Sequence, residues 1–143
     1  DRELNQLLIQ VGEQDDARAA LEALEQKAGT AALAIAGYSF GAWIAAVVGC
    51  RDARVGGLAL IAPPLGLYDF GCLEGKRVPT LAVAGTQDPY CPSADFQRFT
   101  ARFPWITPAV IHGADHFFFG KLYPLGEAAG AWARRLRAEG GGR

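Results

Sequence analysis

The sequence predicts an α/β fold in which a parallel sheet carries helices on both faces. Short apolar runs alternate with longer segments, which is the pattern of successive β-α-β units. The first of these runs is apolar without interruption, as in a strand that is buried on both faces of a sheet. A chain of 143 residues is long enough for one sizeable core but not for two ordinary domains, so we expect residues 1–143 to form a single domain.

The first part of the chain contains two predicted strands. Residues 13–28 have apolar side chains at helical spacing and stop at Gly29, which predicts an amphipathic helix. The apolar run 31–36 predicts the first strand, and the almost wholly apolar residues 40–49 predict a buried helix after it. The second strand is expected over residues 55–62.

The second part of the chain predicts two more strands and two more helices. Residues 63–78 contain Pro, Gly and Asp with little periodicity, so they are expected to form a loop. The runs 80–84 and 109–111 predict the third and fourth strands. Between them Ser93 is expected to cap a helix, and apolar side chains at helical spacing over residues 125–136 predict the last helix.

The composition argues against several classes of function. With 14 basic and 15 acidic side chains the formal net charge is −1, which argues against binding to nucleic acid or to an anionic membrane surface. No apolar run reaches the roughly 18 residues that span a bilayer, and no secretory leader pattern is seen. An odd number of widely spaced cysteines favours reduced thiols and a cytoplasmic location over a disulfide framework. These are Cys50, Cys72 and Cys91.

The predicted first strand and helix are joined by residues 37–41, which have the pattern Gly-x-Ser-x-Gly. Between a strand and a helix this pattern forms a turn so tight that its flanking positions lack side chains, and it lifts the serine hydroxyl above the sheet. The chain has only two serines, and two flanking glycines arise by chance for roughly 1–2% of serines at this glycine content. Ser39 is therefore the candidate nucleophile, and the backbone N–H of Phe40 is the candidate donor to an oxyanion.

A serine hydroxyl needs a base, and the chain has only two histidines. His116 lies in the loop beyond the last predicted strand, from which it can reach back over the strand ends. His112 ends that strand, where a structural role is more typical. The two also form His-x-x-x-His, a zinc pattern when it lies on a helix, but Gly113 disfavours a helix and no third ligand is evident. We expect His116 to be the base and no metal to be bound.

The base in turn needs an acid that orients it. Asp88 follows the third predicted strand, and the chain order Ser, Asp, His favours it, although an aspartate before proline is also common in turns. Two alternatives stay open: Asp69 after the second strand, and Asp115 beside His116. We expect a carboxylate oxygen of Asp88 within about 3.2 Å of one His116 ring nitrogen, with the other nitrogen facing the serine.

Aromatic side chains near these strand ends are candidates to line a substrate pocket, although aromatics there are as often part of the core. The candidates are Tyr38, Tyr90 and Phe117, together with Phe118 and Phe119.

These motifs together resemble the α/β-hydrolase family. Residues 37–43 (GYSFGAW) resemble its nucleophile elbow, residues 85–92 (GTQDPYCP) its acid loop and residues 113–118 (GADHFF) its histidine loop. The last is similar to the small lidless bacterial hydrolases grouped with the dienelactone hydrolases. Dienelactone hydrolases proper use a cysteine nucleophile, where this chain has Ser39. The resemblance covers roughly residues 12–138.

The resemblance implies a serine hydrolase that cleaves a carboxylic ester or a similar acyl bond of a small molecule. Ser39, His116 and Asp88 would be nucleophile, base and orienting acid, and no cofactor would be needed. Two alternatives stay open: a non-catalytic binding domain of the same fold, and a thioesterase or peptidase that uses the same three residues.

The resemblance also implies that the functional unit has further strands before residue 1. Family members have eight strands, and the four predicted here are similar to the last four. The earlier strands would bring a His-Gly loop with a second oxyanion donor, and no His-Gly precedes Ser39. The chain also contains no Met. We expect the run 31–36, taken alone, to be an apolar edge through which copies of the chain self-associate.

Overall fold

A computed structural model describes residues 33–141 of the chain, with side chains through residue 138. The helix predicted over residues 13–28 lies outside the described residues. In chain order the described elements are β1 (Leu33–Tyr38), α3 (Phe40–Arg51), β2 (Val55–Ile61), the 3-10 helix η1 (Gly71–Gly75), β3 (Thr80–Gly85), α4 (Ser93–Arg102), β4 (Ile106–Ile111) and α5 (Leu122–Gly141).

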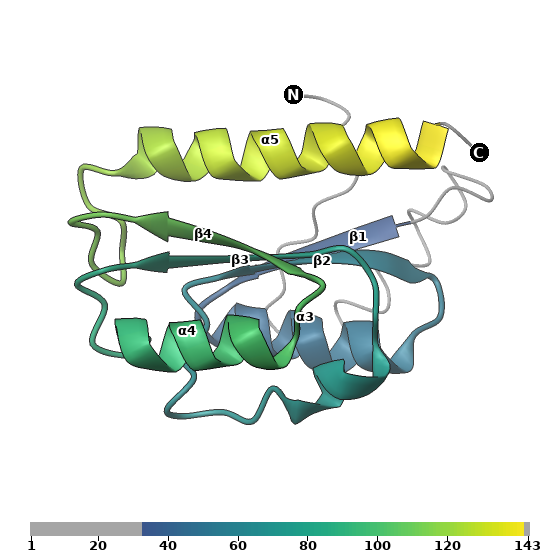
Figure 1. Ribbon diagram of the computed structural model, residues 1–143, viewed down its shortest axis with the longest axis horizontal. Helices are drawn as coiled ribbons and strands as arrows, with labels where there is room; N and C mark the ends of the chain where they lie inside the picture. The colour runs from purple at the N-terminus through teal and green to yellow at the C-terminus, as the bar shows by residue number, and fades with distance from the viewer. Residues whose placement is uncertain (1–32, 142–143) are drawn as a thin grey trace.

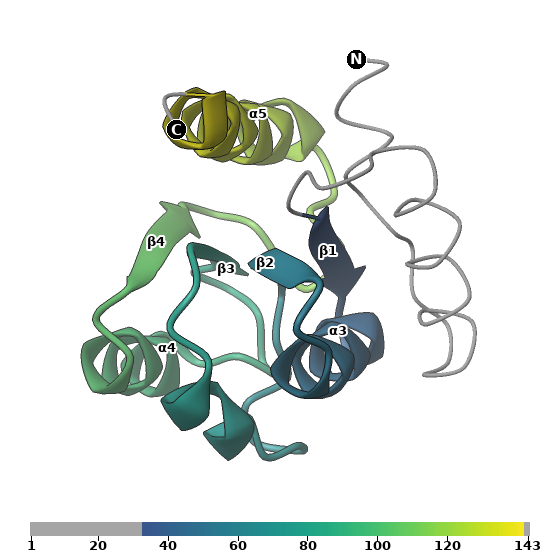
Figure 2. The same ribbon diagram turned by 90° about the vertical axis from the view of Figure 1, so that its right-hand side faces the viewer.

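The four strands form one parallel sheet whose spatial order, β1-β2-β3-β4, is the order of the chain. Crossovers between parallel strands are right-handed, so steps in one direction across a sheet place their connections on the same face. Figures 1 and 2 show this arrangement: among the described elements, α3, η1 and α4 lie on one face and α5 lies on the other. The predicted fold class, a parallel sheet with helices on both faces, is confirmed.

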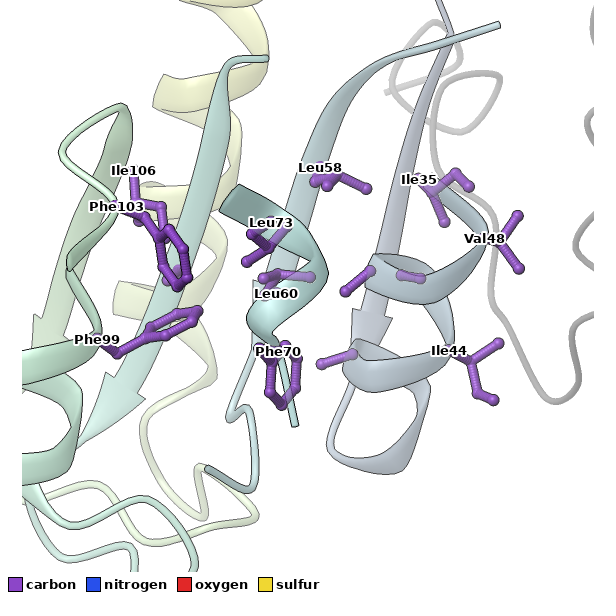
Figure 3. Packing of buried hydrophobic residues seen from close by; sticks show 14 of the residues in the cluster. Ile35, Ile44, Val48, Leu58, Leu60, Phe70, Leu73, Phe99, Phe103 and Ile106 are labelled. Atoms are coloured by element: carbon purple, nitrogen blue, oxygen red, sulfur yellow. The ribbon is translucent and has the colours of Figure 1, made fainter. Parts of the chain in front are cut away.

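Alternate residues of β1, β2 and β3 enter two separate cores, because successive side chains of a strand point to opposite faces. Ile35, Leu58 and Leu60 face α3, η1 and α4, as Figure 3 shows. Ala34, Leu81 and Val83 face α5, where Trp132 and Ala133 cover them. The larger side chains that close the first core are Ile44, Val48, Phe70, Leu73, Phe99, Phe103 and Ile106. Burial on both faces explains why β1 to β3 are apolar almost without interruption.

Two strands extend beyond the residues that the sequence predicts. β1 continues to Tyr38 rather than ending at residue 36, because Gly37 and Tyr38 pair with the last two residues of β2. β4 begins at Ile106 rather than at residue 109 and pairs with β3 along its whole length. The first half of β4 was not predicted because it contains Pro108, and proline has no N–H to donate to a neighbouring strand. Proline is tolerated mainly in edge strands, and β4 lies at an edge of the described sheet.

Two expectations for the helical segments were wrong. Ser93 is the first residue of α4 and does not cap it, because Pro92 occupies the N-cap and no side-chain capping hydrogen bond is present there. Residues 63–78 are not loop throughout, because η1 forms within them. Leu73 of η1 is completely buried in the first core, so tertiary contact rather than periodicity stabilises this short helix.

Within residues 33–141, β1 has a strand neighbour on one side only, and its expected self-association stays a prediction. In the same part of the chain, no helix combines the length and the apolarity needed to cross a lipid bilayer.

The loops after β3 and β4 are held together by backbone contacts. The N–H of Gln87 donates to the carbonyl of Ala114 at 2.9 Å, and the N–H of Gly113 donates to the Thr86 hydroxyl at 2.8 Å. A Cβ added at Gly85 would lie 2.3 Å from the Ala114 carbonyl oxygen, which is closer than atoms can approach. Glycine at the end of β3 therefore permits the two loops to meet.

We expect Gly85→Ala to destabilise the fold, because the methyl group meets backbone atoms that cannot move aside alone. The free energy of unfolding in urea should fall by about 1–3 kcal/mol, the range for overpacked sites. Gly66→Ala is the matched control: a Cβ there meets nothing within 4 Å, so the change should stay within about 0.5 kcal/mol. Equal stabilities of the two variants would contradict this account of the loop contact.

Candidate active site

Three side chains reach one edge of the sheet from the ends of three strands. Ser39 directly follows β1, Asp88 lies three residues beyond β3, and His116 lies five residues beyond β4. Because the strands are parallel, their carboxyl ends meet at the same edge, which is where open α/β sheets bind ligands.

Ser39 occupies the sharp turn that the Gly-x-Ser-x-Gly pattern predicts. Its φ of 57° and ψ of −121° lie in a region that residues other than glycine rarely adopt. A hydrogen bond to the neighbouring strand holds the turn in place, because the Ser39 N–H donates to the carbonyl of Ile61, the last residue of β2, at 2.8 Å. A Cβ at Gly37 would lie 2.0 Å from the Gly41 carbonyl oxygen, so this flanking position must be glycine.

The three side chains form a continuous hydrogen-bond chain. Ser39 Oγ lies 2.7 Å from His116 Nε2, and His116 Nδ1 lies 2.7 Å from Asp88 Oδ2. An ionised carboxylate only accepts hydrogen bonds, so Nδ1 carries the proton and Nε2 of the neutral ring accepts the bond from the serine hydroxyl. The expected contact between Asp88 and His116, with the other ring nitrogen facing Ser39, is confirmed.

The site is shielded from water on the acid side. The side chain of Asp88 has no exposed surface, and His116 is 6% exposed. The second carboxylate oxygen of Asp88 accepts the backbone N–H of Tyr90 at 2.8 Å, which satisfies the buried group and fixes its orientation.

The carboxylates of the two alternative acids, Asp115 and Asp69, accept backbone hydrogen bonds in their own loops. Oδ1 of Asp115 accepts the backbone N–H groups of Phe117 and Phe119 and so closes the turn after His116. Oδ1 of Asp69 accepts the N–H of Gly71 at the start of η1. The geometry therefore favours Asp88 over both alternatives.

The aromatic candidates surround the imidazole of His116. Ring centroids of Tyr38, Tyr90 and Phe117 lie 5.5, 4.9 and 5.4 Å from that of His116. All three rings are exposed on their other sides. Phe118, in contrast, is buried in the second core. The rings thus form apolar walls beside the serine and histidine.

The hydroxyl of Tyr38 has a second role that the sequence did not reveal. It donates to the carbonyl oxygen of His116 at 2.6 Å and so ties the end of β1 to the histidine loop. Burial raises the pKa of Tyr38, and the negative charges of Asp88 and Asp115 raise it further. The hydroxyl therefore keeps its proton at neutral pH and stays a donor.

Phe40 begins α3, immediately after the serine. The first N–H groups of a helix have no acceptor within the helix, so the Phe40 N–H is the donor that the turn offers to an oxyanion. The Phe40 ring, 44% exposed, packs against Trp43 and Tyr68.

Two further positions shape the site without being catalytic candidates. Thr86 and Gly85 join the acid loop to the histidine loop, as described above. No local pattern marks Thr86, because its partner Gly113 lies in a loop after another strand. A glycine that ends a buried strand is a general signal of close backbone approach, and Gly85 fits it.

His112, the second histidine, is exposed in the turn after β4. Within the described part of the chain, no three histidine, cysteine, aspartate or glutamate side chains are grouped so that they could hold a metal ion.

Comparison with known proteins gives a relative by sequence and solved structures of the same fold. An uncharacterised protein of Rickettsia prowazekii is 35% identical over 128 residues, which cover 82% of this chain and 54% of that protein. A solved protein of unknown function from Agrobacterium tumefaciens, a candidate α/β hydrolase, is 33% identical with a TM-score of 0.79, covering 91% of this chain and 63% of its own. By its fold, the chain belongs to the α/β-hydrolase superfamily.

A second solved α/β hydrolase, a serine hydrolase without a lid from Xanthomonas campestris, is 28% identical with a TM-score of 0.75. The match covers 86% of this chain and 56% of that one. The chain thus spans between half and two thirds of the length of these relatives. No protein-family model matches it.

We expect Tyr38→Phe to loosen this candidate site, because the substitution removes only the hydrogen bond to the His116 carbonyl. The free energy of unfolding in urea should fall by about 0.5–1.5 kcal/mol, the usual contribution of one hydrogen bond. Tyr123→Phe makes the same chemical change at a side chain that is 78% exposed, and should alter stability by less than about 0.5 kcal/mol. An unchanged stability in Tyr38→Phe would argue against a fastening role for its hydroxyl.

Proposed function

We propose that this α/β-hydrolase chain carries the site of a serine hydrolase that cleaves a carboxylic ester or a similar acyl bond of a small molecule. The observation that carries the proposal is the hydrogen-bond chain from Ser39 Oγ through the His116 ring to Asp88, with 2.7 Å at each step. Nucleophile, base and orienting acid are recognised by this geometry and these roles rather than by sequence position.

In the proposed reaction Ser39 Oγ attacks the carbonyl carbon of the ester while its proton passes to His116 Nε2. The Asp88 carboxylate stabilises the imidazolium that results, and the Phe40 N–H donates to the oxyanion. His116 then returns the proton to the leaving alcohol, and an acyl group stays on Ser39. Water activated by the same nitrogen releases the acid. These steps need no metal or organic cofactor.

The surroundings of the serine support this chemistry. A non-glycine residue with φ near +57° stores backbone strain, which clusters at functional sites. Tyr38, Tyr90 and Phe117 give the ester apolar walls beside the base. Because serine hydrolases of this fold use two N–H donors, we propose that the second comes from a segment outside residues 33–141. The expected cytoplasmic location stays part of this proposal.

We expect a fluorophosphonate probe to label the chain at Ser39, since the probe needs only an activated serine. Losing one oxyanion donor costs about 10²–10³ in kcat, so covalent labelling is a more sensitive measurement than turnover. Ser39→Ala should abolish labelling, whereas Ser93→Ala, which changes the exposed second serine, should keep it. Labelling is read by intact mass and peptide mapping, with folding checked by circular dichroism.

A folded wild-type chain that resists the probe would favour the non-catalytic domain of the same fold. Hydrolysis of an ester, a thioester and a peptide, measured on chain that has not been treated with the probe, would separate the remaining alternatives. With the best of these substrates, His116→Ala should lower kcat by a factor on the order of 10⁴–10⁶, because Ser39, His116 and Asp88 act as a unit.

Asp88→Asn tests the identity of the acid. The amide cannot stabilise the imidazolium and favours the wrong ring tautomer, so kcat should fall by about 10³–10⁴. Asp69→Asn is the matched control, because its carboxylate bonds only to a backbone N–H at the start of η1, and it should keep kcat within about threefold. The reverse order of effects would transfer the orienting role to Asp69.

A further inference from the structure

Cys50 and Cys72 are 22 positions apart in the sequence, yet the fold brings their sulfur atoms to 2.7 Å. Cys50 is the next-to-last residue of α3, and Cys72 is the second residue of η1. Both are free thiols. A disulfide bond is about 2.05 Å long, so the two sulfurs need to approach by only about 0.65 Å to bond.

Buried neighbours hold the two cysteines in place. Leu73, which follows Cys72, is completely buried in the first core, and Val48, two residues before Cys50, is also buried there. Helix α3 lies so close to β2 that a Cβ at Gly49 would come within 2.6 Å of the Leu58 side chain. Both sulfurs are therefore carried by backbone segments anchored in one core, on the face of the sheet where α3 and η1 lie (Figure 2).

The two thiols differ in accessibility and acidity. Cys72 is exposed, whereas Cys50 is half-buried. The Cys50 thiol donates its hydrogen bond to Cys72 Sγ, and this bond lowers the pKa of Cys72. Partial burial and the charge of Asp69 act in the opposite direction, and the charge of Arg51 adds to the lowering. The same bond and burial raise the pKa of Cys50. The first proton therefore leaves the exposed sulfur, and thiolates are the reactive form of cysteine.

We propose that Cys50 and Cys72 form a redox modification site, at which a hydroperoxide converts the thiol pair into a disulfide that joins η1 to the end of α3. The Cys72 thiolate attacks a peroxide oxygen, the O–O bond breaks, and one water leaves after protonation, with sulfenic acid on Cys72. Cys50 Sγ then attacks the Cys72 sulfur, the S–O bond breaks, and the departing hydroxide takes the Cys50 proton. Two thiols and one hydrogen peroxide thus give one disulfide and two waters.

The proposed disulfide is independent of the hydrolase proposal. Neither cysteine takes part in the contacts among Ser39, His116 and Asp88. The cross-link would close a loop of the unfolded chain and thereby stabilise the fold. Reversible, redox-sensing disulfides are also the kind found in reducing compartments.

The third cysteine serves as an internal control. Cys91 is fully buried, and burial raises its pKa to about 12, with the charge of Asp88 adding to the effect. It should therefore react with neither peroxide nor alkylating reagents while the chain is folded.

The test is mild oxidation of the reduced chain with hydrogen peroxide, followed by alkylation, mass spectrometry and trypsin digestion. Trypsin cleaves after Arg51 and Arg54, between the two cysteines, so the disulfide would join peptide 28–51 to peptide 55–76. We expect this linked pair, a single alkylatable thiol after denaturation, and a rise in Tm of about 5 °C that dithiothreitol reverses. At neutral pH, native Cys72 should also be alkylated about tenfold faster than Cys50.

Substitutions separate the two steps. Cys50→Ser should leave a sulfenic acid on Cys72 that a cyclic dione traps, and Cys91→Ser should still form the linked peptides. A folded wild-type chain that oxidises without joining these peptides, that links Cys91 instead, or that forms only disulfides between chains would overturn the proposal. The wild-type measurement decides even where a variant fails to fold.

Discussion

The parallel pairing of β1 to β4 is the constraint on which the rest of the structure depends. Parallel strands end at the same edge of a sheet, so the residues that follow three of them come together although they are up to 77 positions apart. The same pairing buries both faces of the central strands, and this requires helices on each side. Sheet direction thus sets both the cores and the position of the candidate site.

Close contacts between backbone segments then fix the positions of the loops that carry the site residues at this edge of the sheet. At Gly37 the turn before α3 leaves no room for a Cβ, and at Gly85 the end of β3 touches the loop after β4. Hydrogen bonds complete the frame, from the Tyr38 hydroxyl to the His116 carbonyl and from the Tyr90 N–H to Asp88. Ser39, His116 and Asp88 are therefore each held in place by further contacts, in addition to the hydrogen bonds that link them to one another. Such support is what a site needs if its reacting groups are to be organised before substrate binds.

The two proposed sites lie at opposite ends of α3. The candidate hydrolytic site lies at the carboxyl edge of the sheet, at the start of α3, and the cysteine pair lies at the other end of the same helix. The helix between them is largely apolar and well packed, with seven buried residues among its twelve. A cross-link at its far end would therefore brace the element that carries the serine turn without entering the site itself.

The sequence by itself determined the fold class and the serine turn, and it favoured His116 and Asp88 as the partners of Ser39. These features have local signals: uninterrupted apolar runs, a Gly-x-Ser-x-Gly pattern between strand and helix, and acidic and histidine residues in the loops after later strands. It could not choose firmly among Asp88, Asp69 and Asp115, because all three lie in loops whose paths depend on distant contacts. Only the tertiary structure decided that Asp88 faces His116, that Leu73 draws residues 71–75 into a helix, and that Cys50 meets Cys72. In each case the deciding contact joins segments from different strands or connections, and no short pattern along the chain encodes such a contact.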